Sequence, residues 1–305
     1  MRHVFDSPQP YWIYKKNQRE LLPTHGEVHG RIKTDVGIIG GGIVGLLSGL
    51  LLLRSGRAVT VLEAKEPCSG ETSRSTGHLS EVLDTRFDHL VQRFGLEETL
   101  LFSESHRMAI HRLGGLIEEL EGIGACGWSR LPGFLFCESS DQEESLEREW
   151  SVLDQLHIPS SLVKNVPLPF SVLHAIRIEN QAQVDPQDLQ RLLLNTFLKE
   201  GGKFYDHTSV ESVHPIPRGV RVLTSGGGSL SCDQCIISTH SPVLFPSVAH
   251  FELKPMQSYV LAAQLKTSPL MDGLFWDMNS PYHYLRMASG TLLVGGEDHR
   301  TGSPN

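Results

Sequence analysis

The sequence lacks the features that mark several classes of protein. Its 305 residues hold 27 Lys and Arg against 35 Asp and Glu, a formal net charge of −8, with no block of basic residues. Because phosphate binding needs clustered cations, no nucleic-acid partner is expected. The N-terminus has no secretory-type apolar segment, and the densest apolar run, at 43–53, is about half of a ~20-residue membrane span. We therefore expect no membrane span and a cytoplasmic location.

Disulfide and metal-site patterns are also missing. The five cysteines are odd in number and scattered, which argues against a disulfide framework. Cys232 and Cys235 form a C-x-x-C in strand-like sequence without a second pair, so no redox or zinc role is expected. The 15 histidines are dispersed and include no H-E-x-x-H, so no metal site is predicted. The composition is that of an ordinary globular protein, long enough for two domains.

Glycine, by contrast, is concentrated at one point. Residues 40–45 read GGGIVG, which fits G-x-G-x-x-G and follows a short apolar run at 35–39. Gly40 permits a tight turn from strand to helix, and Gly42 lets the backbone approach a pyrophosphate. Gly45 allows the helix to pack closely on the strand. The motif predicts a dinucleotide-binding βαβ unit.

The residues after the motif support this interpretation. Ile43 and Val44 open a helix whose unpaired N–H groups and partial positive charge suit a diphosphate. A second buried strand is predicted at 59–62, followed by Glu63 and Ala64. Glu63 lies 18 residues after the last motif glycine, near the ~20 expected for an acid that binds ribose hydroxyls. Its charge disfavours NADP, but the motif does not separate NAD from FAD.

The segment CSGETSRSTGHLSEVLD, at 68–84, helps to decide between NAD and FAD. FAD is longer than NAD, and its ribityl chain and isoalloxazine need a second stretch of close backbone approach. Small and hydroxyl residues here can supply it. A solvated Ser/Thr loop is the alternative interpretation of the same composition. The candidates are Gly70, Thr72, Ser73, Thr76 and Gly77.

VGIIGGGIVGLLSGLLLLRSGRAVTVLEA, followed by SGETSRSTGHL, resembles the FAD-dependent oxidoreductases of the D-amino-acid oxidase and glycine oxidase (DAO) type. Three later segments extend the resemblance over most of 33–299: QVDPQDLQRLLLNTFLKEGGKFYDHTSVESV, GVRVLTSGGGSLSCDQCIISTH and YHYLRMASGTLLVGGEDH. The resemblance implies an α/β fold of glutathione-reductase type, in which a Rossmann-like FAD-binding domain joins an antiparallel-sheet substrate domain. It also implies FAD as cofactor, an amine or amino acid as substrate, and oxygen or another electron acceptor.

The resemblance also implies roles for single residues. Val210 and Thr239 are expected to contact the cofactor. His78 falls beside the isoalloxazine and is the candidate catalytic residue, able to bond the flavin, contact the substrate or attach flavin covalently. A loop histidine satisfied by the backbone is the alternative.

Three residues of later strands are candidates for substrate binding. They are Tyr259, Tyr284 and Arg286. Arg286 is able to clamp a carboxylate through two parallel hydrogen bonds. Strand residues that simply pack or face solvent are the alternative. Hydride transfer from an amine to flavin N5 needs orientation more than a strong base, and no base is evident.

The match is strongest to a subgroup that often carries a C-terminal Rieske domain, through STGHLSEVLDTRF and FWDMNSPYHYLR. This chain has no C-x-H or C-x-x-H, so no such cluster is expected. The family usually has Gly where His240 ends the IISTH strand, and its pattern continues past Asn305. We therefore interpret the chain as truncated or a fragment. A catalytically silent flavoprotein-like scaffold is the alternative function.

The expected organisation has three parts. Residues 1–32 form an N-terminal arm, 33–90 and 176–245 the FAD-binding domain, and 91–175 and 246–305 the substrate domain. Periodicity and turn residues also predict individual elements. Helices are expected at 87–94, 96–121, 142–157 and 187–199, and strand sequence at 220–224, 230–233, 235–238, 258–265 and 282–294. Hairpin turns are expected at 225–228 and, within the last of these segments, at 289–290.

Overall fold

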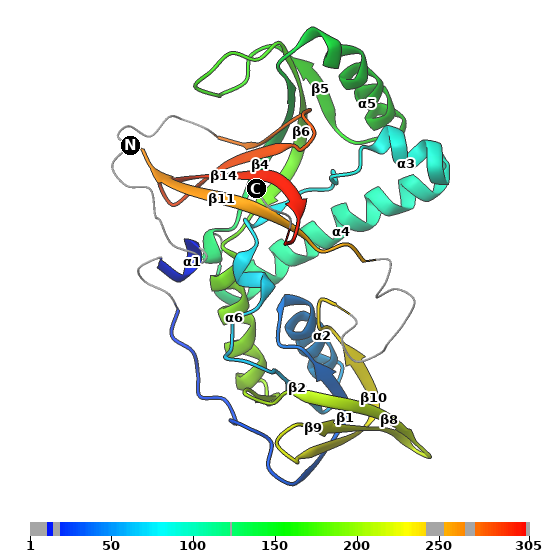
Figure 1. Ribbon diagram of the computed structural model, residues 1–305, viewed down its shortest axis with the longest axis vertical. Coiled ribbons are helices and arrows are strands. Elements are labelled where there is room, and N and C mark those ends of the chain that lie inside the picture. The colour runs from blue at the N-terminus through cyan, green and yellow to red at the C-terminus, as the bar shows by residue number, and fades with distance from the viewer. Residues whose placement is uncertain (1–10, 15–18, 123, 242–252, 266–271, 303–305) are drawn as a thin grey trace. The chain divides into compact units, whose positions relative to one another are not determined.

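The computed structural model describes residues 11–14, 19–122, 124–241, 253–265 and 272–302 (Figure 1). Its contacts divide the chain into two units, each built from separate stretches of sequence. The glycine-motif unit comprises Gln9–Ser75 and Pro186–Lys254. The large-sheet unit takes its described residues from Thr76–Asp185 and Pro255–Asn305. These divisions differ from the predicted domain bounds by about ten to fifteen residues, and the glycine-motif unit includes most of the predicted arm.

Both units mix helices and strands. The glycine-motif unit contains α1 (Tyr11–Tyr14), β1 (Arg31–Ile39), α2 (Ile43–Arg54), β2 (Val59–Leu62), α6 (Pro186–Lys199), β7 (Lys203–Tyr205), β8 (Val210–Ile216), β9 (Gly219–Thr224) and β10 (Ser229–Ile237). The large-sheet unit contains β3 (His78–Leu79), α3 (Phe87–Phe94), α4 (Leu96–Glu121), β4 (Ser129–Cys137), α5 (Glu143–Gln155), β5 (Ser160–Val163), β6 (His174–Gln183), β11 (Met256–Gln264), β12 (Leu274–Asp277), β13 (His283–Ala288) and β14 (Thr291–Arg300).

The sheet of the glycine-motif unit has the strand order β7-β2-β1-β10-β9-β8. Neighbours from β7 to β10 are parallel, and β9 and β8 add an antiparallel hairpin. Helix α2 connects β1 to β2 and packs on α6, where a side chain at Gly49 would lie 2.9 Å from the Phe197 ring. β2 is buried along its whole length, as expected for a parallel strand covered on both faces. The predicted βαβ unit is confirmed.

The large-sheet unit is built on eight strands in the order β11-β14-β13-β12-β4-β6-β3, with β5 also paired to β6. Most neighbours are antiparallel, as expected. The exception is the central pair, in which β12 runs parallel to β4. The sheet is therefore mixed, because β12 follows β4 at a long sequence interval and no hairpin constrains its direction.

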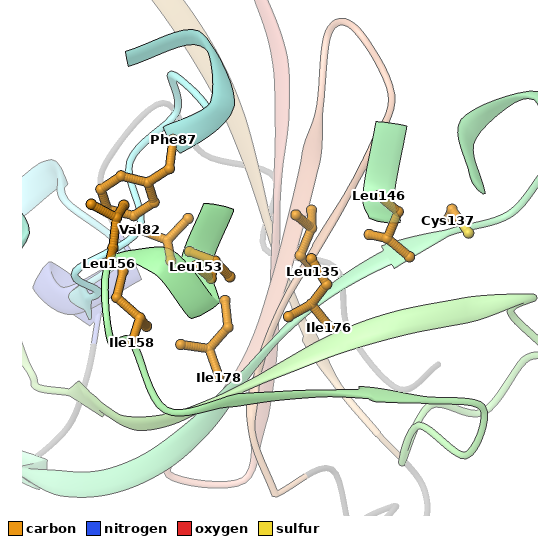
Figure 2. Close-up of a cluster of buried hydrophobic side chains, with 10 residues drawn as sticks. All are labelled: Val82, Phe87, Leu135, Cys137, Leu146, Leu153, Leu156, Ile158, Ile176 and Ile178. Carbon is orange, nitrogen blue, oxygen red and sulfur yellow. The ribbon is translucent and has the colours of Figure 1, made fainter. Parts of the chain in front are cut away.

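Helices α3 and α5 pack near this sheet around one apolar cluster. Figure 2 shows its members: Val82, Phe87, Leu135, Cys137, Leu146, Leu153, Leu156, Ile158, Ile176 and Ile178. A buried carboxylate, Glu149 of α5, accepts hydrogen bonds from the backbone N–H groups of Phe87 and Asp88, at 3.0 and 2.9 Å. It thus caps the N-terminus of α3. Burial raises the pKa of Glu149.

Several predicted elements have the observed bounds, and others need correction. β2, α3 and α4 match their predictions. The predicted strands at 230–233 and 235–238 are one continuous strand, β10, because Asp233 and Gln234 are exposed and do not interrupt its pairing with β1. β1 begins at Arg31, so the end of the predicted arm belongs to the sheet. No helix among the described residues is both long and apolar enough to span a membrane.

Candidate functional site

The glycine turn begins where β1 ends. Gly40 has φ +105°, and its N–H donates to the Leu62 carbonyl of β2 at 2.8 Å. A Cβ at this position would lie 2.5 Å from the Ser238 carbonyl oxygen. The Ser238 hydroxyl shares its one hydrogen between the carbonyls of Ile39 and Gly40, each 3.0 Å from Oγ. Only glycine therefore fits the first turn position, and Ser238 holds the turn in place.

Helix α2 starts directly after this turn. A Cβ on Gly45 would lie 2.1 Å from the Gly40 carbonyl oxygen, so the close approach depends on glycine. The N-cap is Gly42, which has no side chain to cap the helix. Thr72 supplies a substitute, since its Oγ1 accepts from the Ile43 N–H at 3.1 Å. The N–H groups of Gly42 and Val44 have no acceptor within the described ranges, and they leave donors for an anion.

Glu63 lies at the end of β2 beside this turn. Its Oε2 accepts from the Gly41 N–H at 2.8 Å, and its Oε1 accepts from the Lys65 N–H at 3.0 Å. The backbone of Glu63 is itself held by Tyr205 and Thr208. Each carboxylate oxygen keeps a second lone pair, so the oriented group can still accept from hydroxyls. The geometry brings the predicted acid to the glycine motif.

Gln190 of α6 completes the turn, and sequence reasoning did not find it. The side chain is buried, and its Nε2 donates to the Gly41 carbonyl at 2.9 Å. In a trans peptide the C=O and the next N–H point in opposite directions, so this bond turns the Gly42 N–H away from Gln190. The side-chain Oε1 of Gln190 has no donor within the described parts of the chain. Its sequence signal is weak, because Gln190 is one of two glutamines, with Gln187, on the buried face of α6.

The remaining cofactor candidates of this unit have other contacts. The buried Ser73 hydroxyl donates to the Gly70 carbonyl at 2.7 Å and closes its own turn. Val210 packs against the cluster that includes Leu62. The Thr239 hydroxyl donates to the Ser241 carbonyl at 2.8 Å. Ala64 is exposed after β2. Their cofactor contacts remain predictions.

In the large-sheet unit the structure brings several further candidates together. The rings of His78 and Tyr284 meet edge to face, with centroids 5.4 Å apart at 81°. Tyr284 shares a hydrogen bond with Thr76, and burial raises the pKa of its phenol. The Gly77 carbonyl accepts from the Val184 N–H at 3.0 Å. Thr76, Gly77, His78 and Tyr284 thus form one polar and aromatic group, which we call the His78 cluster.

Arg286 supports the His78 cluster through hydrogen bonds to the backbone. Arg286 as a whole is 2% exposed, and its guanidinium donates to the carbonyls of Gly77 and Val184, at 2.8 and 3.1 Å. Tyr259 is half exposed on β11, and its ring stacks on that of His299 with centroids 4.9 Å apart. Substrate binding by Tyr259 and Arg286 remains a prediction. The hydrogen bonds of Arg286 to the backbone indicate a structural role.

The imidazole of His78 is kept uncharged. Burial, then the nearby Arg286 cation, lower its pKa to about 3, against a backbone hydrogen bond to Leu285 that raises it. The ring is therefore neutral at physiological pH. No group of metal-ligating side chains that could hold an ion occurs among the described residues.

Comparison with known proteins decides the family. The model of the family described as FAD dependent oxidoreductase, DAO, matches residues 35–305. The chain belongs to this family. It is 26% identical to a Bacillus subtilis (strain 168) protein that carries the name of a Rieske 2Fe-2S iron-sulfur protein, over 97% of this chain and 58% of that protein. The chain thus spans less than two thirds of the length of this relative.

Solved structures show what the fold is similar to. Glycine oxidase from Geobacillus kaustophilus superposes with a TM-score of 0.70 at 19% identity, covering 90% of this chain and 73% of that one. Iminodiacetate oxidase from Chelativorans sp. BNC1 superposes with a TM-score of 0.66 at 20% identity, covering 88% and 72%. The predicted α/β fold is confirmed.

FAD is the cofactor of this family, and the glycine turn fits its diphosphate. The N–H groups of Gly42 and Val44, which have no acceptor among the described residues, are suitable donors to the diphosphate. Gly42 has no side chain that would keep the diphosphate away from them. Glu63 is placed to accept from a ribose. The predicted cofactor is therefore confirmed at the level of the family, while the individual contacts remain predictions.

Proposed function

We propose that this DAO-family chain oxidises an amine or amino acid, with hydride transfer to flavin N5. The observation that carries the proposal is the glycine turn, whose free amides and adjacent carboxylate suit FAD. The oxidases named for glycine and for iminodiacetate, to which the fold is similar, support a small amine as substrate.

Bound FAD supplies the hydride acceptor, and the chain supplies binding and orientation. The N–H groups of Gly42 and Val44, at the positive end of α2, would donate to the diphosphate, and Glu63 would accept from a ribose hydroxyl. The substrate carbon loses a hydride and its nitrogen a proton, which leaves an imine for hydrolysis. His78 is not the base for that proton at neutral pH, because its pKa is about 3. An amine that reacts in its neutral form needs no such base.

The test has two stages. The visible absorption spectrum of the purified protein should show the two bands of oxidised flavin, either as isolated or after addition of FAD. The flavin bands should then bleach anaerobically with one or more of glycine, N-methylglycine, L-proline and iminodiacetate. Glycolate is the matched control, since it offers a hydroxyl in place of the glycine amine and should leave the bands unchanged.

The two stages contradict different parts of the proposal. A protein that takes up no FAD would contradict the oxidoreductase function for this chain and support a catalytically silent scaffold. A yellow protein that glycolate reduces as fast as the amines would contradict the substrate class alone.

A further inference from the structure

His78 occupies a defined place in the large-sheet unit. It begins β3 and pairs with Gln183 of β6, while its ring lies against Tyr284 of β13. Gly295 of β14 pairs with Tyr284, and a Cβ there would lie 2.2 Å from the Tyr284 ring. The tyrosine can therefore lie flat over β14 only because Gly295 has no side chain, and this placement brings Tyr284 to His78.

The hydrogen bonds of the ring identify its tautomer. A hydrogen bond to the Leu285 backbone raises the pKa of the ring, which is the effect of a carbonyl acceptor, so we assign a ring N–H as its donor. The other nitrogen, Nε2, is enclosed and has no partner within the described ranges. Nδ1 is therefore the donor, and Nε2 carries the free lone pair.

A buried acceptor without a donor is uncommon in folded proteins and calls for an explanation. The second proton that would turn Nε2 into a donor is opposed by burial and by the Arg286 cation, which is fixed to the Gly77 and Val184 carbonyls. Nε2 can therefore only accept. Any group that satisfies it must bring a hydrogen, and the described chain brings none.

We propose that His78 Nε2 accepts a hydrogen bond from an N–H group of a bound ligand. The inference rests on the proposed function, which supplies two sources of that N–H: the imide of the flavin ring, or the nitrogen of an amine substrate. His78 is then a binding residue with a fixed tautomer. It moves no proton, and its role differs from that of an acid or a base.

Two substitutions separate the two nitrogens of the ring. In H78N the short amide keeps a donor near Nδ1 for the Leu285 carbonyl but loses the acceptor at Nε2. In H78Q the longer side chain carries its oxygen to the place of Nε2. The proposal predicts that H78N loses the ligand bond and that H78Q largely restores it. Urea unfolding of both variants shows whether either has lost stability instead.

The flavin source is tested on the FAD-loaded protein by titrating the imide N–H with base and following visible absorption. If Nε2 accepts from the imide, the imide pKa falls in H78N and returns toward the wild-type value in H78Q. The amine source is tested with N-methylglycine and with methoxyacetate, which has a similar shape but no N–H. If Nε2 accepts from the amine, the Kd of N-methylglycine rises about tenfold in H78N only, while that of methoxyacetate is unchanged.

A change in either series supports the proposal and names the source. An FAD-loaded, amine-oxidising wild type in which neither series changes would overturn it, and the proposed function would still stand. Should H78N fold poorly, the ¹⁵N shift of His78 Nε2 in labelled wild-type protein replaces it. That shift must move upfield on ligand binding, toward the value of a hydrogen-bonded acceptor, and an unmoved shift overturns the proposal.

Discussion

The low pKa of His78 makes the stability of the fold depend on pH, and H78Q isolates the effect. In the folded chain the pKa is about 3, whereas the unperturbed imidazole titrates near ~6.5. Between these two pH values the His78 imidazole of the unfolded chain binds a proton, whereas that of the folded chain does not. Stability contributed by the neutral ring is therefore complete above about pH 6.5 and falls as the pH is lowered toward the folded pKa.

The size of the effect follows from the two pKa values. At about pH 5.5 the imidazole of the unfolded chain is some ten parts protonated to one part neutral, and the folded ring is still neutral. The free energy of unfolding is then lower by about 1.4 kcal/mol than at about pH 8. Glutamine has no proton to gain, so the variant lacks this loss.

Urea unfolding at equal flavin load measures the difference between wild type and H78Q at each pH. All other titrating groups, including His283, which lies between Asp277 and Glu297, are common to both proteins and cancel. The difference should shift by about 1.4 kcal/mol in favour of H78Q as the pH falls from about 8 to about 5.5. A difference that stays constant to within about 0.3 kcal/mol would refute the lowered pKa of His78.

Four further changes test the site and its supports. E63Q should weaken FAD binding about tenfold or more, because an amide cannot accept from both the Gly41 and Lys65 N–H groups; flavin fluorescence titration measures it, and an unchanged Kd would count against a role at the ribose. Q190M should weaken the binding of FAD and of ADP about fivefold each, since the Gly41 carbonyl loses its donor; an effect on FAD without one on ADP would contradict a role at the turn. H240G should be more stable to urea than H240A by about 1 kcal/mol, because residue 240 has φ +64°; equal stability would mean that the backbone relaxes. R286M should lower the free energy of unfolding by about 3 kcal/mol, as two charged hydrogen bonds are lost; unchanged stability with weakened substrate binding would instead support a carboxylate clamp.

Local signals predicted much of the fold. Gly95 and Gly122, both with φ +91°, end α3 and α4, and helical periodicity between these breakers fixes the bounds. Strands β4 and β6 were not predicted. They pair with each other across an intervening helix and strand, and no short hairpin turn joins them. The parallel pairing of β12 with β4 is likewise a long-range choice that no local pattern encodes.

The residues of the site also divide into those that a local pattern predicts and those that only long-range contacts bring in. The spacing of Gly40, Gly45 and Glu63 is a local pattern, and that spacing alone predicts that the three residues meet at one turn. Ser238 and Gln190 reach that turn from positions 198 and 149 residues away from their bonding partners. A single hydroxyl or amide carries no motif, so only the folded arrangement identifies them. The role of Thr72 as a substitute helix cap was hidden for the same reason.

The sheet order of the glycine-motif unit has a consequence for biosynthesis. β1, made early, lies between β2 and β10, and β10 is translated nearly two hundred residues later. Until β10 arrives, one edge of β1 is unpaired and the Gly40 turn lacks Ser238. Helix α6, which carries Gln190, also appears only after most of the large-sheet unit has left the ribosome. A nascent chain would therefore acquire its affinity for FAD only after β10 has been made, so flavin supply should act on a polypeptide that extends past β10 rather than on the β1–α2–β2 stretch alone.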